Sequence, residues 1–225
     1  LGGELLARTR CPLFRDSQNL RCSKRLPHSG CAVIEGVRTS FAVLGGSAAC
    51  VAPSSSELAV ALGALAANVT LLSQDGIHER VLPLLDLYLL PGDSPEREFA
   101  LQPGELLTSV TVPVQAQRRY GYARTAQSPL EPVASAAVML EQRDHKIVDA
   151  RVILGGLSTR PWRASKAEAV LIGQSSNIAL FEKAAAAALE DAAIRPGSRP
   201  IVVAGKQVVE TALRRVGDED GRKRS

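Results

Sequence analysis

Short apolar runs separated by polar turns occupy the first half of the chain, whereas longer stripes with helical spacing dominate the last third. Runs of four to seven apolar or alternating residues bounded by Gly, Pro, Asp or Ser are typical of β-strands. The pattern therefore predicts short strands at residues 41–46, 69–72, 79–82 and 106–112. The turn residues Gln74-Asp75-Gly76 lie between the second and third of these runs, which we expect to pair as a hairpin.

A helix is predicted after the first strand. Ser54 and Glu57 have the spacing of a capping box, with Ser54 as the N-cap and Glu57 at the third helical position. Leu58, Leu62 and Leu65 then recur at the spacing of one helix face.

The second half changes from strands to helices. Residues 133–140 and 147–154 are two strand-like runs joined by the polar residues 143–146, which predicts another hairpin. Apolar stripes then predict helices at 164–172, 178–193 and 202–216. The polar segment 115–119 is expected to separate two subdomains, and the charged tail 217–225 is expected to be disordered. The order of elements indicates an α+β fold, with an antiparallel sheet packed on helices in the second domain.

Composition excludes two classes of partner. The 225 residues include 45% hydrophobic residues, enough for a substantial core, and the net charge is only +4. Aromatic residues make up 4%, and no basic stripe interleaved with aromatic residues indicates nucleic-acid binding. No apolar run approaches the roughly 18 residues that would span a membrane. The chain begins with Leu1-Gly2-Gly3 and lacks a signal-peptide pattern, so we expect a chain cut from a longer protein.

The most distinctive chemistry is a group of cysteines. All four lie within forty residues, at Cys11, Cys22, Cys31 and Cys50. Such clustering indicates that the four cysteines act together. Two disulfides, a zinc site and an iron-sulfur cluster are the physical alternatives.

Spacing and charge favour a cluster among these alternatives without excluding disulfides. Zinc sites usually contain a close C-x2-C pair, and none occurs here. A larger cluster can be wrapped by a long irregular loop, and Pro27-His28-Ser29-Gly30 is turn chemistry of that kind. Cations also outnumber acids around the cysteines, which suits the negative charge of four thiolates. The cations are Arg8, Arg10, Arg15, Arg21, Lys24, Arg25 and Arg38, against Glu4, Asp16 and Glu35.

Several segments together resemble the FAD-binding medium subunit of the xanthine dehydrogenase family of molybdenum hydroxylases. The similarity is greatest to the branch of aldehyde oxidoreductase and 4-hydroxybenzoyl-CoA reductase medium subunits, which carry an extra 4Fe-4S loop. The segments are Gly2-Gly3, residues 8–16, Cys22-Ser23-Lys24-Arg25, Ser29-Gly30-Cys31, Leu44-Gly45-Gly46 before Cys50, residues 101–107 and residues 154–164.

The resemblance implies cofactors and roles. Cys11, Cys22, Cys31 and Cys50 would ligate a 4Fe-4S cluster, while the FAD contacts would come from Gly2, Gly3, Glu57 and Leu107. It also implies a partial FAD-binding domain of the molybdopterin-dehydrogenase type over 1–114, with the cysteine loop inserted at 11–50. The C-terminal α+β domain of the flavoprotein subunit would span 115–216.

The sequence departs from the family pattern at three places within the expected flavin site. Glu4 replaces the usual asparagine, Ser54 to Glu57 replaces a His-Pro-Ser-Asp pattern, and Arg124 is the only cation near the usual lysine. The glycine-rich pyrophosphate loop of the family is expected to lie before this region.

The function implied is that of an oxidoreductase subunit, and it requires partners. A molybdopterin-binding large subunit and a 2Fe-2S small subunit would supply electrons, which would pass to FAD and then to an external acceptor. The compartment would be the cytoplasm, or the periplasm if the chain is exported with a partner. The alternatives are a scaffold subunit that has lost flavin and a disulfide-stabilised exported domain.

Overall fold

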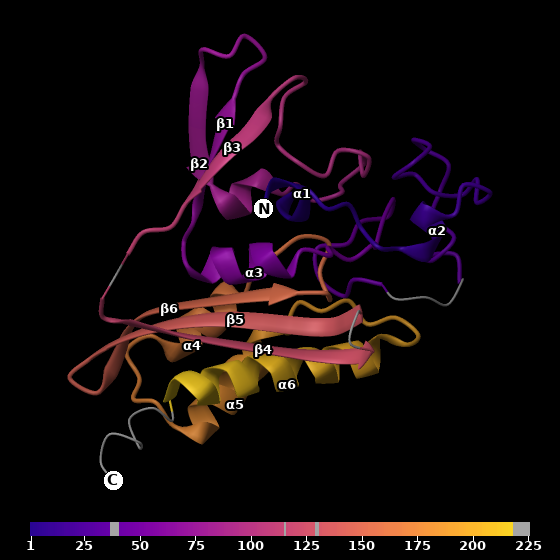
Figure 1. The fold of residues 1–225 in the computed structure, drawn as a ribbon. Coiled ribbons are helices and arrows are strands. Elements are labelled where there is room, and N and C mark those ends of the chain that lie inside the picture. Colours follow the sequence, from indigo (N-terminus) through magenta and orange to yellow (C-terminus); the bar gives the residue numbers. More distant parts are fainter. Residues whose placement is uncertain (37–40, 115, 129–130, 218–225) are drawn as a thin grey trace.

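A four-stranded antiparallel sheet, in the order β4-β5-β6-β7, forms the centre of the second half of the chain (Figure 1). The computed structural model describes residues 1–36, 41–114, 116–128 and 131–217. Its strands are β4 (Arg118–Ser128), β5 (Glu131–Arg143), β6 (Lys146–Gly155) and β7 (Trp162–Arg163). The predicted hairpin between residues 133–140 and 147–154 is confirmed by β5 and β6. Asp144 and His145 in its turn both have positive φ, 50° and 61°, the backbone geometry of a type I′ turn.

Helices cover both faces of this sheet, which explains why β5 reads as a continuous apolar run. On one face, Val138 and Leu140 belong to the main core with helices α4 (Ser165–Leu171), α5 (Ile178–Ala188) and α6 (Ser198–Gly217). On the other face, Ala137 and Ile153 pack against α3 (Glu57–Ala64). Figure 1 shows α3 along one side of the sheet and α5 and α6 along the other.

The three predicted C-terminal helices are confirmed, with different ends. Helix α5 begins after Asn177, whose side chain accepts a hydrogen bond from the Leu180 N–H at 2.8 Å. It ends at Ala188 instead of residue 193, and α6 begins four residues earlier than predicted, at Ser198. No helix in the described part of the chain has the length and apolar composition needed to cross a membrane.

A smaller three-stranded sheet in the first half has the order β2-β1-β3. Its strands are β1 (Asn68–Leu72), β2 (Glu79–Pro83) and β3 (Leu106–Thr111), and a 3-10 helix, η1 (Leu84–Leu87), follows β2. Both pairings are antiparallel, so the hairpin predicted from residues 69–72 and 79–82 is confirmed. Figure 1 shows this sheet rising from the end of α3, away from the larger sheet.

Two local predictions are wrong. Ser56, not Ser54, is the N-cap of α3, and its hydroxyl accepts a hydrogen bond from the Ala59 N–H at 3.1 Å. Ser54 lies outside the helix, and its N–H donates to the Ser158 carbonyl at 2.8 Å. Residues 41–46 do not form a strand, and their one bridge joins Leu44 to Ser158. Their backbone groups bond instead to separate loop segments, so no ladder develops.

The cysteine segment is a largely irregular loop, as its turn residues predict. One four-residue helix, α2 (Pro12–Arg15), is its regular element within the described residues, and another, α1 (Gly2–Leu5), precedes it. Strand β4, which the apolar pattern did not predict, begins at Arg118 inside the segment expected to separate two subdomains. The tail predicted to be disordered lies outside the described residues after Gly217. The mixture of helices and antiparallel sheets confirms the α+β fold class.

Candidate functional site

The four cysteines line one small cavity. Cys11, Cys22, Cys31 and Cys50 come from separate turns of the loop, and all four contribute to the cavity wall. Cys22 and Cys31 face each other across an isolated antiparallel bridge. In the structure all four are free thiols. The structure thus brings together four side chains that the sequence spreads over forty residues.

Local turns hold the cysteine loop in this shape. The Cys22 N–H donates to Ser29 Oγ at 3.0 Å, and the Gly30 N–H donates to Ser23 Oγ at 2.9 Å. Gly30 has a φ of +88°, and a Cβ there would lie 2.9 Å from a carboxylate oxygen of Glu35. Gly30 is therefore favoured for its backbone conformation, whereas the Glu35 carboxylate is the end of a flexible side chain that could move aside.

Two of the cysteines are buried, and burial dominates their acidity. It raises the pKa of the Cys50 thiol to about 11, against a smaller lowering by the Lys24 ammonium. Burial also raises the pKa of Cys11, opposed by the backbone N–H groups of Phe14 and Leu13. Within the described ranges, no three His, Cys, Asp or Glu side chains converge closely enough to hold a single metal ion. The arrangement thus offers four soft donors around a cavity, without the tight convergence of a zinc site.

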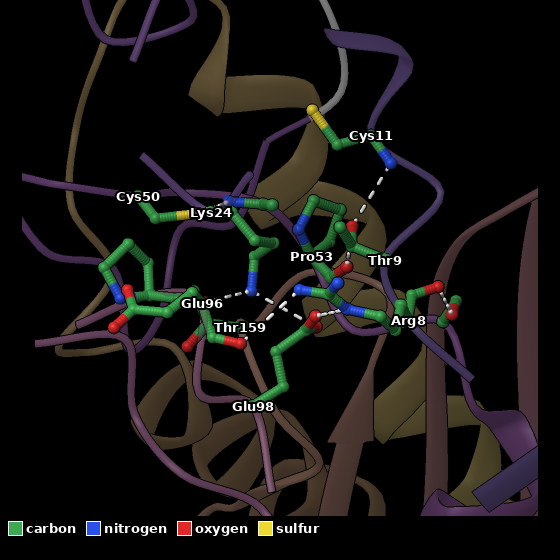
Figure 2. Close-up of polar contacts among 12 residues, drawn as sticks. Arg8, Thr9, Cys11, Lys24, Cys50, Pro53, Glu96, Glu98 and Thr159 are labelled. Carbon is green, nitrogen blue, oxygen red and sulfur yellow. Dashed lines mark hydrogen bonds and ion pairs between the residues drawn. The ribbon is translucent and has the colours of Figure 1, made fainter. Parts of the chain in front are cut away.

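A buried lysine lies beside the cavity and joins the loop to a distant segment (Figure 2). The Lys24 side chain is 7% exposed, and its Nζ donates to the Pro95 carbonyl at 2.9 Å. The same Nζ lies 3.2 Å from a carboxylate oxygen of Glu98. The other Glu98 oxygen lies 2.5 Å from Arg8 Nε, so the carboxylate is shared by two cations. Lys24 comes from the cysteine loop and Arg8 from the three residues before it, so this carboxylate anchors the loop and its N-terminal approach to residues 95–98.

A second group of polar residues surrounds the start of α3. Glu57 accepts a hydrogen bond from the Tyr122 hydroxyl at 2.7 Å and forms an ion pair with Arg124 at 3.3 Å. Burial, and next the Glu57 carboxylate, raise the pKa of Tyr122 to about 12. The Glu57 carboxylate, at the start of α3, is therefore held against β4 by two partners.

The predicted flavin-contacting residues lie on three elements, α1, α3 and β3, which contribute to one apolar cluster. Gly2 and Gly3 form the start of α1, which packs on α3. A Cβ added at either glycine would meet no atom within 4 Å, so this backbone is open to close approach by a ligand. Leu107 on β3 packs against the same apolar cluster as Leu5 of α1. The structure places all of these residues on α1, α3 and β3.

Three residues that hold the candidate sites in place were not predicted from the sequence. Tyr122 and Glu98 lie 65 and 74 residues from the side chains they bond, Glu57 and Lys24, so local pattern carried no signal for either contact. Lys24 was counted only as one of several cations near the cysteines. A lysine between closely spaced cysteines could have indicated a distant acidic partner, because a buried ammonium needs an anion nearby.

Two family models match successive parts of the chain. Residues 32–115 match the FAD binding domain in molybdopterin dehydrogenase. Residues 123–200 match the CO dehydrogenase flavoprotein C-terminal domain. The first match includes Cys50, Glu57 and Leu107, and the second includes β5, β6 and the first two helices of the C-terminal core.

Individual proteins show the same similarity. The aldehyde oxidoreductase FAD-binding subunit PaoB of Escherichia coli is 41% identical over 171 residues, which cover 75% of this chain and 52% of PaoB. The glyceraldehyde dehydrogenase medium chain of Sulfolobus acidocaldarius is 28% identical over 123 residues, covering 54% of this chain and 41% of that one. The chain thus spans about half the length of these curated relatives.

Solved structures share the fold. A CO dehydrogenase structure from Oligotropha carboxidovorans superposes with a TM-score of 0.63 at 22% identity, covering 96% of this chain and 70% of that chain. The quinoline 2-oxidoreductase of Pseudomonas putida 86 superposes with a TM-score of 0.61 at 20% identity, over 80% of this chain and 59% of that one.

Proposed function

The chain belongs to the FAD-binding medium subunit family of molybdopterin dehydrogenases, and on that basis we propose that it is part of an electron-transfer flavoprotein subunit. The complex would be a molybdenum-dependent hydroxylase or aldehyde oxidoreductase. In it, electrons would pass from an iron-sulfur subunit to FAD and on to an external acceptor. The observation that carries the proposal is the pair of successive family matches, because together they account for both sheets of the fold.

We assign the flavin contacts to residues of α1, α3 and β3. FAD, when bound, supplies a carrier that exchanges electrons with one-electron and two-electron partners. Gly2 and Gly3 would let the backbone approach the cofactor, which is supported by the open space above both residues. Glu57 would accept hydrogen bonds from the cofactor, held in place by Tyr122. Leu107 would pack beside the flavin from β3.

We assign a 4Fe-4S cluster to Cys11, Cys22, Cys31 and Cys50. The cluster, when bound, supplies a one-electron centre held by four thiolates. The assignment is supported by four free thiols on one cavity wall and by the absence of a close zinc-type pair. Lys24 would hold positive charge next to Cys50, offsetting the negative charge of the thiolates.

The proposed assembly follows from the same family. We propose a molybdopterin-binding large subunit and a 2Fe-2S small subunit as partners. Residues 1–114 would form the flavin and cluster domain, and residues 115–216 would form the C-terminal domain. A reducing compartment, the cytoplasm, suits four thiols that remain free.

The flavin assignment is tested by cofactor content. The purified complex that contains this chain is expected to release close to one FAD per chain on acid denaturation, whereas a flavin-free scaffold would release none. Glu57→Gln removes the carboxylate charge, and we expect it to lower FAD retention. Glu79→Gln is the matched control, because Glu79 is exposed on β2. Equal FAD content in both variants would remove Glu57 from the site.

The cluster assignment is tested separately by iron and acid-labile sulfide. Anaerobically purified protein is expected to contain both, and Cys31→Ser should lose most of each because a hydroxyl is a poor replacement for a thiolate ligand. Ser17→Ala is the control, because Ser17 is exposed in the same loop. Intact mass with and without reductant detects the disulfide alternative, since two bridges would add about 4 Da on reduction. Iron and sulfide absent from protein that still holds FAD would overturn the cluster alone.

A further inference from the structure

A cavity of about 470 Å³ lies at the end of α3 opposite Glu57. Its walls come from the loop after α3, from the junction of β2 and η1, and from the β6 to β7 region of the larger sheet. It is therefore built by both halves of the chain. The volume lies in the range typical of small-molecule sites.

Three arginines line this cavity: Arg151 on β6, Arg160 before β7 and Arg163 on β7. Asp86 on η1 is the one acidic residue of its lining, and it forms no ion pair within the described residues. Asp86 is also exposed, and among the described residues it pairs with none of the three arginines. The walls therefore carry an excess of positive charge.

Two of the arginines have buried nitrogens without partners. Arg151 Nη1 and Arg160 Nε are shielded from solvent and bond to no atom of the described residues. A guanidinium nitrogen in that state costs free energy, because its desolvation is not offset by a hydrogen bond. Buried donors of this kind in native proteins call for a partner, and a ligand in the adjoining cavity would provide one.

The remaining contacts show which arginine charges are already used. Arg163 is paired with Glu168 at 3.0 Å, and Arg160 Nη1 donates to the Tyr88 carbonyl at 3.1 Å. The pKa of Arg151 is lowered, first by burial and then by the positive charge of Arg163. An anion in the cavity would offset both effects on Arg151 at once.

We propose that this cavity binds a phosphate group, either as inorganic phosphate or as the phosphate of a nucleotide. Guanidinium groups match the oxygens of phosphate in charge and in geometry, and two of them here have donors to spare. The cavity is separate from Glu57, the proposed flavin contact on α3, because the eight residues of α3 span about 12 Å between the two ends.

Phosphate binding to the full-length protein provides the test, measured by isothermal titration at low ionic strength. Inorganic phosphate, pyrophosphate and ADP are the probes, and they distinguish a free phosphate from a nucleotide. Arg151→Gln removes a donor that has no protein partner, so it should fold and weaken binding about tenfold. Arg160→Gln is a second variant of the same site. Asp86→Asn should leave binding intact or tighten it, because it removes the one negative charge from the lining.

Only the arginine variants are expected to weaken binding, although Asp86→Asn changes the lining of the same cavity. Weaker binding in Arg151→Gln together with unchanged or tighter binding in Asp86→Asn supports the site. No saturable binding of any probe to the wild type overturns it, as does equal affinity in Arg151→Gln and the wild type. FAD content, measured on the same samples, is expected to be unchanged, so failure here is distinguishable from failure of the proposed function.

Discussion

Replacing Lys24 with methionine tests how the cysteine loop is anchored. The substitution keeps an unbranched apolar stem and removes the ammonium from a side chain that is 7% exposed. It breaks the bond to the Pro95 carbonyl at 2.9 Å and the ion pair with Glu98 at 3.2 Å. Removing one member of a fully buried ion pair costs about 3–5 kcal/mol.

The expected cost is smaller here, because Glu98 is not left alone. Its other oxygen keeps Arg8 at 2.5 Å, and the Glu98 side chain retains 15% exposure. One lost hydrogen bond from a charged donor then sets the scale, at about 1.5–3 kcal/mol. For a chain of this size that free energy corresponds to a fall in Tm of about 3–12 °C.

The assay is thermal and urea unfolding of the full chain, followed by circular dichroism. Lys206→Met on α6 is the control, since Lys206 is exposed, and it should change stability by less than about 0.5 kcal/mol. Equal stability of Lys24→Met and the wild type would refute the idea that this buried lysine fixes the loop. Destabilisation equal to that of the control would refute it as well.

Three further predictions concern the frame around the site. The Arg80 guanidinium, and next the Gln102 N–H, hold the pKa of Glu105 at about 2, below the free value of about 4.3. The charged Glu105 therefore contributes fully to stability at pH values above the free value of about 4.3. This contribution should disappear as pH falls toward 2, and the difference in urea midpoint between the wild type and Glu105→Gln should shrink over that window. Gly121→Ala would place a Cβ 2.4 Å from the Ala212 carbonyl oxygen, and it should destabilise the β4 to α6 contact by about 1–3 kcal/mol in urea unfolding. Ser56→Ala removes the N-cap of α3 and should cost about 1 kcal/mol in the same assay.

Each of these has a clear contrary result. A difference between wild type and Glu105→Gln that is independent of pH would mean that the Arg80 pair does not control this carboxyl. A stable Gly121→Ala protein would show that α6 can move away from β4. If Ser54→Ala costs as much as Ser56→Ala, then the helix start is not at Ser56.

Regular elements were predictable where one local signal was sufficient. The hairpin of β1 and β2 and the hairpin of β5 and β6 follow from apolar runs bounded by turn residues. Strand β4 was not predicted, because Gly121 and the polar residues around it break the apolar pattern, while α6 packs on it from far along the chain. The start of α3 was misplaced by two residues, because Ser158 fixes the backbone of Ser54 and comes from a distant segment.

The group of cysteines could be predicted from the sequence, but the residues that surround and hold the candidate sites could not. The clustering of cysteines in sequence indicated that the four act together, and the structure places all four on one cavity. The anchor from Lys24 to Glu98 and the bond from Tyr122 to Glu57 depend on long-range contacts, which carry no local pattern. The arginine-lined cavity likewise requires both halves of the chain to be folded together.

Electron transfer through the flavin is the central claim, and it is tested most directly in the purified complex. The complex is reduced anaerobically with dithionite, freed of excess reductant and mixed with an artificial electron acceptor, once with FAD present and once after its removal. We predict that acceptor reduction is lost without FAD and restored when FAD is added back. Acceptor reduction at the same rate in the flavin-free complex would contradict the account.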